Sequence, residues 1–309
     1  MLHSHIPGRG RRAIPMPVGR RRQPAFTLVE LLVSIGICVL FAGLLVPALV
    51  RVGEAANCTS CRNNLRTLGR AAHLYHDAHG KLPPGQLAAA PDRTTADAGF
   101  WNSPWVGTLP FLLPFLEENQ LALQLPAWDI KSQGPAWWTD EAMVRPARTA
   151  VAVFFCPSDQ AQTSRSAALG LHNYRGGVAR LLSADPAAGA GFARTNYLGV
   201  QGVFDSRTQV SLDWLAAQAG TSHSAMLGET LGGSPDGPRD YAWAWMGSPP
   251  LPEVGSANRS PSWLRFSSRH TGLVLFYYAD GSVRGQAHCT AARQAAPAPT
   301  TADWLLSGP

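Results

Sequence analysis

The sequence is poor in charged residues, and the charge it has is unevenly placed. Asp, Glu, Lys and Arg make up 15% of the 309 residues, which is low for a cytosolic enzyme. Six arginines in residues 1–25, a stretch without any acid, account for the whole formal net charge of +6, so the rest of the chain is formally neutral. A neutral chain has no electrostatic footprint for a phosphate backbone, which excludes nucleic acid as a partner. The N-terminal arginines indicate targeting instead, because Arg and Lys tend to stay on the cytoplasmic side of a membrane.

The sequence also lacks the short motifs that mark many enzyme sites. It contains no P-loop, no dinucleotide-binding fingerprint, no nucleophile elbow and no triad in the order Ser-His-Asp. No internal repeat of solenoid length is present either. We therefore expect a protein that is not an enzyme and that needs no cofactor.

One long apolar run is present near the N-terminus. Residues 31–50 carry no charge, and residues 26–29 extend the run to about 25 residues with Glu30 as the single interruption. At about 1.5 Å per residue, a helix of this length covers the roughly 30 Å core of a bilayer. The run is too long for the apolar region of a cleaved secretion signal, and no A-x-A-like site follows it. It predicts a transmembrane anchor over residues 26–50.

Glu30 needs an explanation, because a carboxylate deep in an apolar helix costs about a few kcal/mol and usually has a partner. A glutamate at this place can also reach the headgroups. Residues 20–30 (RRRQPAFTLVE) resemble the type III signal of type IV prepilins and pseudopilins. The resemblance implies that a prepilin peptidase cleaves between Ala25 and Phe26 and methylates the new N-terminus at Phe26. It also implies that Glu30 pairs with the N-terminal amine of a neighbouring subunit. Ala25 departs from the family, which usually has Gly before the cut.

The helical pattern continues beyond the apolar run. Four apolar side chains recur at helical spacing on one face, namely Leu65, Leu68, Ala72 and Tyr75. Gly80 and the Pro-Pro-Gly cluster at residues 83–85 stop the helix at about residue 79. Gly and Pro then become frequent, which indicates a loop-rich domain with short strands. Near the C-terminus, residues 272–279 are typical of a buried strand, with a tight turn at Asp280 and Gly281 before a return strand.

A series of motifs in chain order resembles the DUF1559 family of prepilin-like proteins. The matching segments are residues 61–65, 73–85, 113–117, 155–159 (FCPSD), 195–199 (TNYLG) and 220–229, and then His270, which is followed after nine residues by Asp280 and Gly281. The resemblance implies an α+β protein in which a long N-terminal transmembrane helix extends into a β-rich, loop-rich, pseudopilin-like globular domain. It divides the chain into a basic leader (1–25), a long helix (26–80), a globular domain (81–284) and an Ala/Pro-rich tail (285–309).

The resemblance also has consequences for the five cysteines. Cys61 and Cys156 occupy the two cysteine positions of the family, which implies a disulfide between them on the oxidising side of a membrane. Cys38 lies in the apolar run and most simply packs as a small hydrophobe. Cys58 and Cys289 are left either to pair with each other or to remain free.

A structural zinc ion is the alternative for the first of these cysteines. Cys58-x-x-Cys61 has the spacing of a zinc knuckle, and His73, His76 and His79 follow it. No second Cys-x-x-Cys follows, however, and three histidines at intervals of three drift around a helix. We favour capping and packing roles for these histidines and expect no metal.

Together these features predict a pilin-like or pseudopilin-like structural subunit of a type IV pilus-like or type II secretion-like assembly. Its partners would be prepilin peptidase, other pilin-like subunits and the membrane. We expect a single pass through the inner membrane, with the globular domain on the periplasmic side.

Two other functions stay open. The first is a membrane-anchored envelope protein that does not polymerise and binds an extracellular ligand, such as a glycan, through its tryptophan-lined loops; the ten tryptophans are more simply explained as core residues. The second is an envelope enzyme that uses His223, Glu229, His270 or Asp280, which requires these side chains to converge. His270 and Asp280 lie at opposite ends of one predicted strand about 30 Å long, which argues against their direct cooperation.

Overall fold

The computed structural model describes residues 27–93, 96–159, 161, 164, 166–173, 179–183, 191–233, 241–251 and 265–287. It is an α+β protein with one long helix, α1 (Leu28–His79). The chain divides into two compact units, residues 1–51 and residues 52–309. The basic leader, the peptide bond between Ala25 and Phe26, and Cys289 lie outside the described residues.

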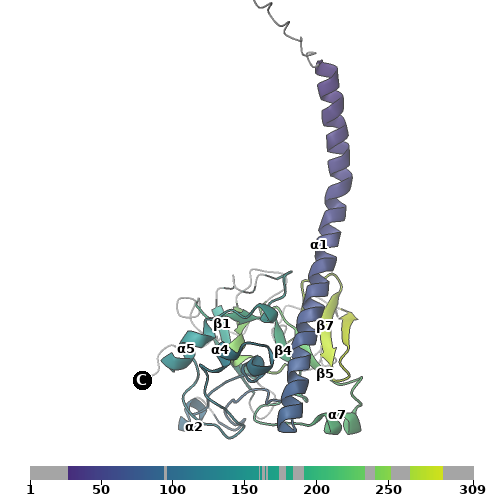
Figure 1. Ribbon diagram of the computed structural model, residues 1–309. Helices are drawn as coiled ribbons and strands as arrows, with labels where there is room; N and C mark the ends of the chain where they lie inside the picture. The colour runs from purple at the N-terminus through teal and green to yellow at the C-terminus, as the bar shows by residue number, and fades with distance from the viewer. Residues whose placement is uncertain are drawn as a thin grey trace, which may run out of the picture. The chain divides into compact units, whose positions relative to one another are not determined.

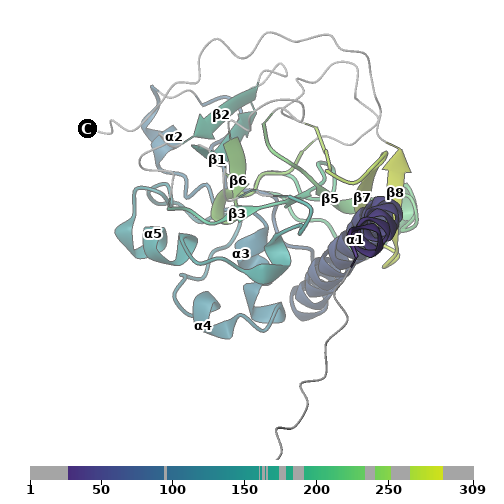
Figure 2. The same cartoon turned by 90° about the horizontal axis from the view of Figure 1, so that it is seen from above.

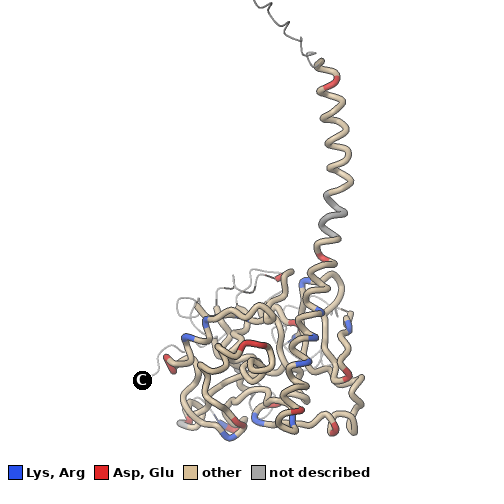
Figure 3. Tube along the Cα trace, in the orientation of Figure 1, with Lys and Arg blue, Asp and Glu red and all other residues tan. Residues whose placement is uncertain are grey.

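The first unit contains the apolar part of α1. Residues 28–45 form a stretch long and apolar enough to span a membrane, and every side chain in it is exposed. Figure 3 shows that the described part of this segment carries a single acidic residue near its start, which is Glu30, and no basic residue. Exposed apolar side chains on all sides of a helix are typical of a surface that meets lipid or other helices.

The second unit contains two four-stranded sheets (Figures 1 and 2). The first has the order β2-β1-β6-β3 and is formed by β1 (Ser166–Asn173), β2 (Ala179–Ser183), β3 (Arg194–Thr195) and β6 (Tyr241–Ala244). The second has the order β4-β5-β7-β8 and is formed by β4 (Tyr197–Gly199), β5 (Ala225–Glu229), β7 (Leu273–Tyr278) and β8 (Val283–Ala287). All described pairs are antiparallel except β1 with β6.

Short helices and turns connect these strands. The α-helices are α2 (Ala98–Trp101), α3 (Leu109–Leu112), α4 (Asn119–Ala122), α5 (Glu141–Ala147) and α7 (Leu212–Gln218), and the 3-10 helices are η1 (Leu113–Phe115), η2 (Ala152–Phe154) and η4 (Trp245–Gly247). Acidic and basic residues are interspersed over the described part of this unit (Figure 3).

Strand β7 shows how the core is built. Its side chains alternate between two apolar clusters, as the two-residue period of a strand requires. Leu275 and Tyr277 join the cluster that contains the buried face of α1, whereas Val274, Phe276 and Tyr278 join a cluster shared with β1 and β6. One face of β7 therefore packs with α1 and the other with the first sheet.

The helical face predicted from spacing is the face that is buried. Leu65, Leu68 and Ala72 are completely inaccessible, and Tyr75 is 8% exposed. Helix α1 ends at His79, immediately before Gly80, whose φ of 72° is in the left-handed region that favours glycine. The β7–β8 hairpin also forms where it was predicted, with Gly281 at a φ of 85°. The predicted tail begins too early, because β8 continues through Ala287 and pairs residues 285–287 with β7.

Gly69 brings α1 close to the second sheet. A Cβ atom at this position would lie 2.2 Å from the Tyr277 ring, and Tyr277 is only 2% exposed, so the ring cannot swing aside. We expect Gly69→Ala to destabilise the chain by about 1–3 kcal/mol through overpacking. The matched control is Gly53→Ala on the same helix, where a Cβ meets nothing within 4 Å. That change should be neutral or stabilising by about 0.5–1 kcal/mol. Urea unfolding of the detergent-solubilised chain, followed by tryptophan fluorescence, measures both; equal effects would contradict the packing argument.

Candidate functional site

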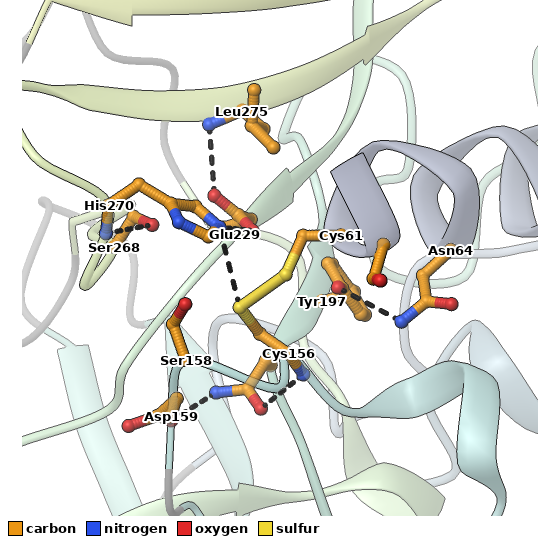
Figure 4. A network of polar contacts seen from close by, with 12 residues as sticks. Cys61, Asn64, Cys156, Ser158, Asp159, Tyr197, Glu229, Ser268, His270 and Leu275 are labelled. Carbon is orange, nitrogen blue, oxygen red and sulfur yellow. Dashed lines mark hydrogen bonds and ion pairs between the residues drawn. A yellow bond between two sulfur atoms is a disulfide. The ribbon is translucent and has the colours of Figure 1, made fainter. Parts of the chain in front are cut away.

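The motif segments recognised along the sequence converge in the second unit. Nine residues from five of these segments form one polar cluster, which we call the motif cluster (Figure 4): Cys61, Asn64, Cys156, Ser158, Asp159, Asn196, Tyr197, Glu229 and His270. They come from α1, the turn after η2, the β3–β4 junction, the end of β5 and the loop before β7. Residues up to 209 positions apart in the chain are thereby brought together.

A disulfide joins Cys61 of α1 to Cys156, with the two Cα atoms 5.3 Å apart. This is the pair that the family resemblance implies. Cys61 is fully buried and Cys156 is 4% exposed, so solvent does not reach the bond freely. The bond attaches the helix covalently to the chain segment that precedes β1.

Two asparagines hold the backbone around this disulfide. Asn64, one turn after Cys61, donates to the carbonyl of Phe155 at 2.7 Å and lies 3.4 Å from the Tyr197 hydroxyl. Asn196 accepts a hydrogen bond from the Cys156 amide at 3.0 Å, and its own amide group donates to Asp159. Both sides of the disulfide are therefore fixed by side-chain amides, that of Asn64 partly buried and that of Asn196 buried, and each satisfies a backbone group.

His270 lies between two carboxylates. Its Nδ1 is 2.5 Å from Oε1 of Glu54 on α1, and its Nε2 is 3.4 Å from Oε1 of Glu229 at the end of β5. The same Nε2 is 3.5 Å from the Sγ of Cys156. Glu229 accepts a second contact, from the backbone N–H of Leu275, and Glu54 accepts one from the Ser158 hydroxyl. His270 thus connects helix α1, strand β5 and the disulfide.

These contacts decide the charge state of the histidine. Burial by itself would lower the pKa of His270, but the contacts with Glu229 and Glu54 outweigh burial and raise that pKa. Burial would raise the pKa of the Glu54 carboxyl, but His270 and Ser158 outweigh it and lower that pKa. Burial, and then the nearby Glu229 charge, raise the pKa of Tyr197, so its hydroxyl remains protonated. At the centre of the cluster, two carboxylates thus favour the protonated form of the His270 imidazole. The salt contact between Arg269 and the buried Asp159 lies next to it.

Comparison of the sequence with known protein families shows to which family the chain belongs. The family described as "Protein of unknown function (DUF1559)" matches residues 52–290, about three quarters of the chain. The chain belongs to the DUF1559 family. The prokaryotic N-terminal methylation motif matches residues 20–46. No curated protein and no solved structure matches the chain.

The methylation motif includes the start of α1, and there the structure shows a capping box. Thr27 precedes the helix, and its backbone N–H donates to Glu30 Oε2 at 2.9 Å, while the Glu30 amide donates to the Thr27 hydroxyl at 3.2 Å. Thr27 and Glu30 therefore satisfy each other's backbone donors, as a threonine and a glutamate three residues apart do at many helix starts. The described end of the signal in this DUF1559 member, residues 27–30, is thus a capped helix N-terminus.

The other candidate residues of this DUF1559 chain lie away from the motif cluster. Asp280 is exposed in the β7–β8 turn, where it accepts from Ser282 and pairs with Arg284. His223 is exposed and contacts Ser222. Of the residues considered for an enzyme site, Glu229 and His270 are in contact, whereas the described contacts of His223 and Asp280 are with other residues.

The histidines of α1 have the packing roles predicted for them. His76 accepts the N-terminal amide of α7, from Leu212, at 3.2 Å. His79 contacts the Tyr75 carbonyl at 2.9 Å and stacks on the Tyr75 ring with 4.0 Å between the ring centroids. His73 packs edge-on against Tyr277. Cys61 pairs with Cys156, whereas Cys58 is a free cysteine at the margin of the core.

Glu54 is the participant that sequence reasoning missed. No motif in the sequence singles it out. Its position did contain a signal, because Glu54 precedes Cys61 by seven residues and therefore lies on the same face two turns earlier. An acid that continues a buried helical stripe needs a partner, and His270 is that partner.

Proposed function

We propose that this protein is a pilin-like structural subunit of a type IV pilus-like or type II secretion-like assembly. The N-terminal methylation motif over residues 20–46 carries this proposal. Prepilin peptidase cleaves between Ala25 and Phe26 and methylates Phe26, and Glu30 becomes the fifth residue of the mature chain. The apolar segment of α1 then packs among the same segments of neighbouring subunits.

The capping box gives Glu30 a role before and after assembly. In the single chain its carboxylate accepts from the Thr27 backbone and hydroxyl through Oε2. A carboxylate has about four lone-pair sites, so Glu30 retains room for the amine of a neighbouring Phe26. A charge in the hydrocarbon region costs about 2.5–3.5 kcal/mol on insertion scales, and such a partner relieves that cost.

The proposed topology places the arginine-rich leader in the cytoplasm and the second unit on the periplasmic side of the inner membrane. The Cys61–Cys156 disulfide supports this orientation, because disulfides persist in oxidising compartments. The glycan-binding alternative has less support. Of the eight tryptophans within the described residues, Trp101 and Trp214 are the exposed ones, and the other six are buried or packed against the core.

Mass spectrometry of the mature protein tests the processing step. We expect the chain to begin with N-methylated Phe26 when it is expressed with a prepilin peptidase, and to keep its leader when the peptidase is absent. Replacing Ala25 by Arg should block cleavage, because the family has a small residue at this place. An intact leader in the presence of the peptidase, or a cut elsewhere, would contradict the proposal.

Glu30→Gln tests assembly separately from folding. Glutamine is also a capping-box residue, so the Thr27 cap is kept and only the charge is removed. We expect normal cleavage but loss of the crosslinked ladder that the wild-type subunit forms with itself or with other pilin-like subunits in membranes. Ladders of equal yield from both proteins would show that Glu30 does not direct assembly.

A further inference from the structure

Four side chains of the motif cluster present ligand atoms to one point. The Sγ atoms of Cys61 and Cys156, an oxygen of Glu229 and a nitrogen of His270 all lie within 4.8 Å of one another, and all four residues are buried. Two sulfurs, an imidazole and a carboxylate are a donor set that suits zinc.

We propose that the chain with this disulfide reduced binds one Zn²⁺ through Cys61, Cys156, Glu229 and His270. Zinc and the disulfide are alternative occupants of the same place, because the same two sulfur atoms form either the S–S bond or two Zn–S bonds. The site is closed, with four protein ligands and no position for substrate, so its role is structural.

Two distances from Nε2 of His270 already fit a tetrahedral ion. Bonds of about 2.0–2.1 Å from zinc to nitrogen and oxygen place two such ligands about 3.3–3.4 Å apart. Nε2 of His270 and Oε1 of Glu229 are 3.4 Å apart. A Zn–N and a Zn–S bond of about 2.3 Å place nitrogen and sulfur about 3.5 Å apart, and Nε2 is 3.5 Å from the Cys156 Sγ. The two sulfurs must separate to about 3.8 Å once their bond is broken, and all four ligand atoms start within 4.8 Å of one another.

Two neighbouring features also point to an ion. Oε1 of Glu229 is buried and makes no hydrogen bond within the described residues; it has the 3.4 Å ion pair with His270, while its other oxygen accepts from Leu275. On the far side of the imidazole, Nδ1 of His270 is 2.5 Å from Oε1 of Glu54. A carboxylate on the second nitrogen of a ligating histidine fixes the ring orientation and tautomer in many zinc sites. Glu54 would therefore orient the His270 ring for binding the ion through Nε2.

The exchange between the two states balances with a dithiol as the reductant. A dithiol reduces the disulfide by two electrons, giving two cysteine thiols and becoming a disulfide itself. Zn²⁺ then displaces the two thiol protons, and the imidazole binds through a deprotonated Nε2. Reoxidation of the two thiolates by a disulfide-bearing oxidant reverses the exchange and releases the ion. A subunit whose disulfide has not yet formed would in this way keep α1 attached to its domain.

The test uses the full chain in detergent with Cys38, Cys58 and Cys289 replaced by serine, so that the remaining thiols are the proposed ligands. The chain is reduced with a phosphine, transferred to metal-free buffer without oxygen, and titrated with Zn²⁺ against a chromophoric chelator. We expect one Zn²⁺ per reduced chain and none per oxidised chain. Co²⁺ in place of Zn²⁺ should give thiolate charge-transfer bands and the ligand-field bands of a tetrahedral site.

Conservative variants separate this site from nonspecific thiol binding. Glu229→Gln keeps an acceptor for the Leu275 amide but weakens the ligand, and Glu54→Gln alters only the residue behind His270. We expect each to lower the affinity for Zn²⁺ by about 10-fold or more. The proposal is overturned if the reduced chain binds no zinc, if the oxidised chain binds it equally, or if both variants bind as tightly as the parent. If the reduced chain unfolds and binds zinc through its two thiols alone, both variants will bind as tightly as the parent, so this case also overturns the proposal.

Discussion

Replacing Cys61 and Cys156 together by alanine should lower the free energy of unfolding of the oxidised chain by about 4–5 kcal/mol. The two cysteines are 95 positions apart, and a crosslink that closes a loop of this length removes a large amount of conformational entropy from the unfolded chain. Because the total stability of a domain is about 5–15 kcal/mol, the loss is a large fraction of the stability expected for the second unit.

The double replacement is the right variant, because a single one would leave a buried thiol beside His270 and Glu229. Urea unfolding followed by tryptophan fluorescence measures the loss, since the core contains buried tryptophans such as Trp105 and Trp243. Reduction of the wild-type chain in the presence of a chelator should bring it to the stability of the variant. Cys58→Ser, three residues before Cys61 and outside the disulfide, is the control and should change stability by less than about 0.5–1 kcal/mol. A loss below about 1 kcal/mol in the double variant would show that the unfolded chain is already compact around this loop.

Local patterns predicted local structure well in this chain. The apolar stripe of α1, its end before Gly80 and the β7–β8 hairpin follow from spacings of at most seven residues, which sequence displays directly. The pairing of the strands does not follow from such spacings. Strand β1 pairs in parallel with β6, which is far away in the chain, and nothing in either strand specifies its neighbour. The disulfide partner of Cys61 came from the family resemblance and not from any spacing.

The contacts of the motif cluster could not be predicted from sequence either, because they depend on how distant segments pair. Along the chain, His270 precedes strand β7 and Asp280 follows it, so sequence alone places these two residues at opposite ends of one strand. The relevant neighbour lies across the sheet, since β5 and β7 are antiparallel and the end of β5 brings Glu229 opposite the start of β7. Such a contact depends on which strands pair. Glu54 is the exception, because its spacing from Cys61 places it on the face of α1 that is buried and so predicts that it has a partner.

His270→Ala is the second change for which we expect a large effect, about 3–5 kcal/mol of destabilisation in the oxidised chain. Glu229 is 2% exposed, and without the imidazolium its charge stays buried and uncompensated. Glu54→Gln is the matched control. The Glu54 side chain is 36% exposed, and an amide keeps an acceptor for Ser158, so that change should cost about 1–2 kcal/mol at most.

The double variant His270→Ala with Glu229→Gln tests whether charge or packing causes the loss. If the buried carboxylate is responsible, removing it should recover a large part of the stability, and the two changes will be strongly non-additive. Additive losses in the unfolding free energies would instead show that the imidazole matters for the space it fills.

The dependence of stability on pH gives an independent signature of the same imidazolium. Because Glu229 and Glu54 raise the pKa of His270 above its unfolded value of about 6.5, its contribution is fully present below about pH 6.5. It is lost as the pH rises through the raised folded pKa, so the unfolding midpoint of the oxidised wild-type chain should fall from about pH 6.5 upward. The double variant lacks the titrating ring and should not show this step. Parallel pH profiles for the two proteins would mean that His270 is neutral in the folded chain, and that its attachment of α1 to β5 does not depend on charge.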